Sequence, residues 1–135
     1  KLDGFMGFDD LDLDNWEVVP FLSIINLDGI HYSHYFSNPF TGRAYGGSVI
    51  TKLGKLKFSF AMGHVQKMEH HKEFLNNGKT ISGLVNGSFY MHDEAYKGPQ
   101  GNHHWRGVCM LNGVKDGDYD IETVRLDYLL AKYHV

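Results

Sequence analysis

Short apolar runs separated by glycine and asparagine turns make up most of this chain. The run at residues 16–25 (WEVVPFLSII) is apolar and β-branched, and Pro20 within it predicts an edge strand or an interrupted strand. The Asp-Gly pair at 28–29 is typical of a tight turn, and it leads into a second strand predicted at residues 30–36 (IHYSHYF). The chain therefore opens with a predicted pair of strands.

The middle of the chain predicts a helix between strands. Residues 44–56 place Val49, Ile50, Leu53 and Leu56 on one helical face, although glycines stand near the start of the segment. The run at 57–62 predicts a buried strand. Further segments are predicted as follows: a loop or short helix at 1–15, a loop or short helical turn at 64–77, a strand with a glycine break at 79–90, a long loop at 91–104, strands at 105–111 and 119–126, and a short helix at 127–133.

Strands outnumber helices in this pattern, at about six against one or two, which favours an α/β or α+β layer arrangement. The length of 135 residues fits a single domain spanning 1–135.

The net charge of −3 argues against general electrostatic binding of nucleic acid, which needs a basic face. A single cysteine, Cys109, allows no internal disulfide and indicates a reducing compartment. No apolar run reaches membrane-spanning length, so no membrane partner is expected.

Nine histidines are many for this length, and several stand where predicted strands end. His31 and His34 lie three residues apart, so on a strand they face opposite sides, and at least one is structural or exposed. His34 lies nearer the carboxyl end of its strand, where sites form in α/β sheets. It is a candidate metal ligand, with a hydrogen-bonded structural histidine as the alternative.

The strand at 57–62 stops at Gly63-His64, where glycine permits a sharp turn. His64 and Gln66 are two residues apart and can face the same side of an extended segment. Imidazole is a common ligand of zinc, manganese and iron, whereas a glutamine oxygen binds more weakly. The alternative is a turn that merely carries a capping histidine.

The remaining candidates lie in the second half of the chain. Arg106 can clamp a phosphate with two nitrogens or pair with a surface carboxylate, and His104 beside it can line the same pocket. His92-Asp93-Glu94 suits a metal or a solvated loop, and neighbouring histidine pairs supply at most one ligand each. Cys109 lies within an apolar strand, where cysteine is usually an inert hydrophobe. No phosphate-loop, dinucleotide or serine-nucleophile motif is present.

The order of these elements is more informative than any one of them. HYSHYF, GRAYGG, GHVQ, SGLVNGSF and HDEAYKGPQGNHHWRGV follow one another, and this series resembles the C-terminal half of the calcineurin-like metallophosphoesterases, in the form found in phages. The resemblance covers residues 16–133. It implies an α/β fold, namely the strand-rich C-terminal half of a four-layer sandwich in which two mixed sheets pack face to face with helices outside.

The resemblance also implies a hydrolase that binds two metal ions about 4 Å apart and cleaves a phosphomonoester or phosphodiester, of a nucleotide or a nucleic acid. His34 and His64 then correspond to metal ligands, and Gln66 stands where the family usually has a second histidine. Arg106 and His104 are expected to contact substrate. Mn²⁺ is the first choice of metal, with Zn²⁺ or Fe²⁺ as alternatives.

The family's N-terminal motifs Asp-x-His, Gly-Asp-x-x-Asp and Gly-Asn-His-Asp/Glu do not occur in this sequence. We therefore expect the chain to be inactive alone, and either to pack against an N-terminal half of the same fold or to associate with itself. The expected location is the cytoplasm of a phage-infected bacterium. Two other hypotheses remain: a non-catalytic binding or structural module derived from this fold, and an unrelated β-rich binding domain whose His34 and His64 would lie more than about 5 Å apart.

Overall fold

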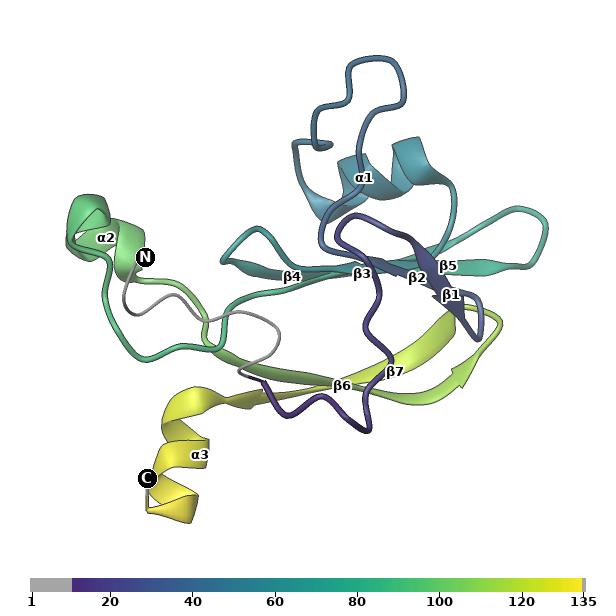
Figure 1. The fold of residues 1–135 in the computed structure, drawn as a ribbon. Coiled ribbons are helices and arrows are strands. Elements are labelled where there is room, and N and C mark those ends of the chain that lie inside the picture. Colours follow the sequence, from purple (N-terminus) through teal and green to yellow (C-terminus); the bar gives the residue numbers. More distant parts are fainter. Residues whose placement is uncertain (1–10, 135) are drawn as a thin grey trace.

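The computed structural model describes residues 11–134, which form a mixed, strand-rich α/β fold. A five-stranded sheet carries helix α1 on one face and the β6–β7 hairpin against the other (Figure 1). The elements are β1 (Ile25–Leu27), β2 (Ile30–Ser33), α1 (Val49–Leu56), β3 (Phe60–Met62), β4 (Met68–Phe74), β5 (Thr80–Asn86), the 3₁₀ turn η2 (Ala95–Lys97), α2 (Gly98–Asn102), β6 (Gly107–Lys115), β7 (Asp118–Arg125) and α3 (Leu126–Tyr133).

The sheet has the strand order β1-β2-β3-β5-β4. Its three central strands, β2, β3 and β5, run parallel, while β1 and β4 pair antiparallel at the two edges. The carboxyl ends of the three parallel strands therefore meet at one edge of the sheet, which is where α/β proteins usually place their sites.

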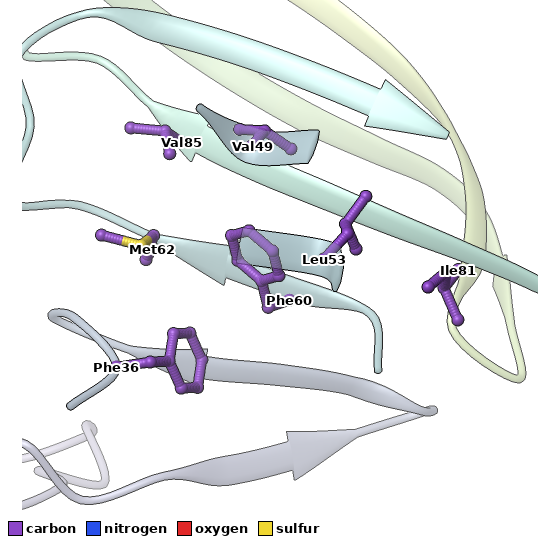
Figure 2. Packing of buried hydrophobic residues seen from close by; sticks show 7 residues of the cluster. All are labelled: Phe36, Val49, Leu53, Phe60, Met62, Ile81 and Val85. Atoms are coloured by element: carbon purple, nitrogen blue, oxygen red, sulfur yellow. The ribbon is translucent and has the colours of Figure 1, made fainter. Parts of the chain in front are cut away.

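Two hydrophobic layers hold the sheet between its neighbours. On the α1 side, Phe60, Val49 and Leu53 are fully buried, and Figure 2 shows them with the other members of this cluster: Phe36, Met62, Ile81 and Val85. On the hairpin side the buried residues are Ile30, Ala61, Leu84 and Tyr119. The alternation of Phe60 and Met62 with Ala61 puts successive β3 residues into different layers, as the pleat of a strand requires.

Helix α1 begins five residues later than the pattern at 44–56 predicts. Ser48 is its N-cap, and the Ser48 hydroxyl accepts a hydrogen bond from the Thr51 backbone N–H. The glycines before the cap lie in an irregular segment, in which Gly47 has φ 90°. The helix ends at Lys57, whose left-handed backbone (φ 62°) closes the last turn.

Two predicted segments were wrong. The strand expected at 16–25 is largely irregular, because Pro20 and the left-handed Leu22 (φ 65°) break it, and only β1 forms beyond them. The loop expected at 64–77 contains β4, a seven-residue edge strand paired along its whole length with β5. Its sequence (MEHHKEF) has no apolar alternation, so its strand character comes from that pairing.

Most of the other predicted elements form, with shifted boundaries, whereas most of the segment predicted at 1–15 lies outside the described residues. Asp28 and Gly29 form the β1–β2 turn with positive φ at both positions. The loop at 91–104 is irregular except for η2 and α2, and α3 forms at the C-terminal end. The glycine break expected in the strand at 79–90 was wrong, because β5 continues through Gly83. The described residues form seven strands, where about six were predicted.

Candidate metal centre

Three polar side chains lie where the three parallel strands end. His34 follows the last residue of β2, His64 follows β3 after Gly63, and Asn86 is the last residue of β5. The register pairs Ser33 with Met62, and Met62 with Val85. These side chains therefore stand next to one another along one edge of the sheet.

The imidazoles of His34 and His64 are in contact. His34 Nε2 and His64 Nδ1 lie 3.2 Å apart, and the rings meet at 75° with their centroids 5.1 Å apart. Two ligands that each bind one ion at ~2.1 Å in tetrahedral geometry lie about 3.4 Å apart. Both histidines are exposed, and their two nitrogens share a hydrogen bond in which one of them carries the proton. Their separation matches two coordination positions on a single cation, which would displace that proton.

The backbone at His64 is responsible for this approach. His64 has φ 66°, a left-handed conformation that is uncommon for residues other than glycine. Strained backbone of this kind is concentrated at functional sites. The turn is tight, because the Val65 N–H donates to the Gly63 carbonyl at 2.8 Å. It directs the His64 ring towards β2.

Aromatic rings surround the pair. The Phe21 ring lies 5.3 Å from that of His34, and the Tyr35 ring lies 4.9 Å from that of His64. Phe21 and Tyr35 also meet edge-on at 6.3 Å. These contacts restrict the orientation of both imidazoles. The segment around Pro20, although not the strand expected there, thus contributes a wall of the site.

A cleft of about 570 Å³ adjoins His34 and Gly63, and its lining does not include His64. His34 and Asn86 line it together with largely apolar residues from the 19–25 segment, the sheet and β6, including Ala61, Leu84 and Leu111. Cys109 also lines it, and burial raises the pKa of its thiol, which is consistent with an inert cysteine. The cleft could hold a ligand with an apolar body beside its polar end.

Gln66 has a partner of its own. Its side-chain oxygen accepts a hydrogen bond from the Lys97 ammonium, which is carried by η2. This contact ties the long loop to the segment after His64, and it brings a cationic side chain beside the turn that carries His64. Sequence reasoning did not identify Lys97.

Arg106 and His104 lie in a second cavity, of about 450 Å³, whose lining does not include His34. The Arg106 guanidinium donates to Asp93 at 2.6 Å and to the Met91 carbonyl at 3.0 Å. His104 Nε2 lies 3.1 Å from the Tyr90 hydroxyl. Both side chains thus hold the loop at 91–104 in place, and the structure does not bring them into the cleft beside His34.

The other histidines have separate surroundings. His31 points away from His34, as the strand alternation predicts, and its Nδ1 lies 3.2 Å from the Ser59 carbonyl oxygen. His70 packs against Tyr119 between the sheet and the hairpin, where burial lowers its pKa and raises that of Tyr119. Within residues 11–134, no group of three histidine, cysteine, aspartate or glutamate side chains is placed to hold a metal ion.

Comparison of the chain with protein-family models, with curated protein sequences and with solved structures finds no match. In the part of the chain that the structure describes, no helix is long and apolar enough to cross a membrane.

Proposed function

We propose that this chain supplies part of the active site of a metal-dependent phosphoesterase, with His34 and His64 as ligands of one divalent cation. The observation that carries the proposal is the contact of 3.2 Å between their ring nitrogens, made by residues 30 positions apart in the sequence. The position of the pair, at the carboxyl edge of three parallel strands beside a cleft, supports it further.

Imidazole nitrogens suit zinc and iron and also bind the harder manganese ion. We propose Mn²⁺ as the first choice, because the further ligands of such a site would be oxygen atoms. A bound cation would act as a Lewis acid on a phosphoryl oxygen and would lower the pKa of a water molecule. His34 and His64 would hold it through Nε2 and Nδ1, and Phe21 and Tyr35 would keep the two rings oriented.

Other residues of the chain would act on the substrate. Gln66 would position water or bind the cation weakly, and this requires its oxygen to leave Lys97, whose ammonium could then approach a phosphate. Arg106 and His104 line the separate second cavity and would contact a part of the substrate away from the metal, with Arg106 exchanging its contact with Asp93 for two hydrogen bonds to a phosphate. The substrate class would be a phosphomonoester or phosphodiester of a nucleotide or nucleic acid, in a phage-infected bacterial cytoplasm.

The remaining ligands would come from another segment, either the N-terminal half of a four-layer metallophosphoesterase sandwich or a second copy of this chain. The β6–β7 hairpin supports a partner, because it forms a two-stranded sheet by itself within the described residues. Strand edges of this kind readily pair with further strands. Val108 and Met110, which are exposed on β6, add apolar surface that a partner could bury.

A non-catalytic module of the same fold is the second candidate. It is favoured by Gln66, which stands at a usual histidine position of the family and whose oxygen is engaged by Lys97. The coding sequence directly upstream distinguishes the two. Intact Asp-x-His and Gly-Asn-His-Asp motifs there support the phosphoesterase, whereas their loss supports the module.

Calorimetric titration with Mn²⁺ and Zn²⁺ tests the metal site. We expect about one ion to bind per chain, and we expect His34→Ala and His64→Ala each to abolish binding. His103→Ala is the matched control, because His103 is an exposed histidine that lines the second cavity. Equal binding by the wild type, His34→Ala and His64→Ala would refute the proposed site.

A further inference from the structure

Asn86 is a residue for which the sequence pattern suggested no role, and it stands in the same row as His34. Tyr32, Ala61 and Leu84 are neighbours across β2, β3 and β5, and all three face the hairpin. Two residues further along each strand the pleat returns to the same face. Asn86 is that residue on β5, whereas His34 and Gly63 are the corresponding residues just past the ends of β2 and β3. All three line the same cleft as Tyr32, Ala61 and Leu84, so His34 and Asn86 stand on either side of Gly63 on this face.

Gly63 leaves the centre of this row open. A Cβ added to Gly63 would lie 3.8 Å from Asn86 Oδ1. The amide oxygen of Asn86 therefore reaches over the glycine, towards the strand whose next residue is His64. Both His34 and Asn86 line the cleft described above, and Asn86 is exposed.

The distances across the row suit one shared cation. Neighbouring strands lie ~4.8 Å apart, which puts the Cα atoms of His34 and Asn86 about 10 Å apart. Both side chains line the cleft beside Gly63, and a metal–ligand bond of ~2.1 Å at each end shortens the span that they must bridge. His64 reaches the same space from the turn after Gly63.

We propose that Asn86 Oδ1 is a third ligand of the cation held by His34 and His64. This inference rests on the proposed function. The resulting set has two imidazole nitrogens and one amide oxygen. Adding the oxygen makes the site more favourable for the harder Mn²⁺, compared with a site of two histidines alone. It also makes the sheet edge a three-point site within the described part of this chain.

A purely structural role for Asn86 makes a different prediction. Asn86 precedes Gly87, which has φ 72°, and Asn-Gly pairs are common in turns. Asn77-Gly78, at the opposite end of β5, is a second such pair, with φ 81° at the glycine. Asn77→Asp is therefore a matched control that makes the same charge change beside the same kind of turn.

The test is Mn²⁺ titration by calorimetry of the wild type, Asn86→Asp, Asn86→Ala and Asn77→Asp, with thermal unfolding of each to verify folding. A charged oxygen strengthens a ligand and a methyl group removes it. We therefore expect Asn86→Asp to bind Mn²⁺ about tenfold more tightly and Asn86→Ala about tenfold more weakly. Asn77→Asp should match the wild type. In ¹H–¹⁵N spectra, Zn²⁺ should shift the side-chain amide resonances of Asn86.

The outcomes separate this inference from the proposed function. If both Asn86 variants bind Mn²⁺ like the wild type while His34→Ala does not bind, Asn86 is no ligand and the histidine site stands. The same conclusion holds if Asn77→Asp strengthens binding as much as Asn86→Asp does, because the effect is then one of general charge. If the wild type and His34→Ala bind alike, both proposals fail.

Discussion

At the scale of single residues, the candidate site depends on an unfavourable backbone conformation. His64 adopts φ 66°, and a side chain in the left-handed region costs roughly 1–2 kcal/mol relative to glycine. A glycine at this position would turn more easily but would carry no imidazole. The strained backbone at His64 is therefore the cost of placing an imidazole, which can bind a metal, at this turn.

His64→Gly should therefore be more stable than His64→Ala. Both variants lose the imidazole, but only glycine adopts the left-handed backbone without a Cβ clash. We expect a difference of about 1 kcal/mol in the free energy of unfolding, measured by urea denaturation. Equal stability of the two variants would contradict a strained turn at this position.

His70 gives the molecule a pH dependence that is separate from the proposed site. Burial against Tyr119 lowers the pKa of His70 in the folded state, so the unfolded chain binds a proton more readily. The stability from the neutral ring is present above the unfolded pKa of about 6.5 and is lost as the pH falls below it.

His70→Gln should flatten the loss of stability between pH 7 and pH 5, measured by urea denaturation with a chelator present. His71→Gln, a change at the next position of β4, is the control and should keep the wild-type slope. If the slopes of the wild type and His70→Gln coincide, His70 does not titrate abnormally in the folded protein.

Residue patterns also show what the sequence could reveal about the site. His34 was predicted because it lies near the carboxyl end of its predicted strand, and His64 because it follows an apolar run and a glycine. Parallel strands bring such ends together. Asn86 has the same signal, because it is a polar residue that ends a buried strand before a glycine. An asparagine is also common in turns, so its position alone did not indicate a ligand. The contact of Lys97 with Gln66 depends on how a 14-residue loop folds back, which no local pattern encodes.

At the scale of elements, Gly83 allows α1 to lie close to the sheet. A Cβ at Gly83 would lie 2.5 Å from Val49 Cγ1 and 2.8 Å from the Phe60 ring. The glycine appeared in the sequence to break a strand, yet β5 continues through it. Its function is steric, since it makes room for the helix over the centre of the sheet.

Gly83→Ala should destabilise the protein by about 1–3 kcal/mol, because both close neighbours are fully buried. Val49→Ala removes one of the two contacts. The double variant should therefore lose less stability than the sum of the single variants, as measured by urea denaturation. Strict additivity would mean that Gly83 and Val49 do not meet.

The elements that were mispredicted share a physical cause. Strand β4 is polar along most of its length and exists because β5 offers it a full set of backbone partners, which is a tertiary effect. The segment at 16–25 is apolar but has no such partner over most of its length, and Pro20 removes a donor within it. Elements with their own signals, such as the Asp28-Gly29 turn and α3, were predicted correctly.

At the scale of the whole molecule, two layers of apolar packing stabilise the sheet. The layer on the hairpin side contains fewer buried residues than the layer on the α1 side. Within residues 11–134, β6 and β7 form a separate two-stranded sheet, which is joined to the rest of the chain by backbone hydrogen bonds at its ends, from Gly107 to Ser88 and from Gly117 to Asp28. Its outer surface includes the exposed Val108 and Met110. An isolated two-stranded sheet is marginally stable in water. Packing against the five-stranded sheet supports this one, and a further partner would support it more.

We therefore expect the isolated chain to associate with itself. Sedimentation velocity should show dimers or larger species, and Met110→Glu should shift the distribution towards monomers by placing a charge on the exposed strand face. Val18→Glu, a change at an exposed apolar residue outside the hairpin, is the control. A wild-type chain that is monomeric and monodisperse across the accessible concentrations would contradict the predicted partner surface.

The most direct test of the central claim is an anomalous difference map from crystals of this chain grown with Mn²⁺. We expect a peak within ~2.0–2.3 Å of both His34 Nε2 and His64 Nδ1, the two nitrogens that lie 3.2 Å apart. A map with no peak between these nitrogens, at a manganese concentration that saturates binding in solution, would contradict the metal centre.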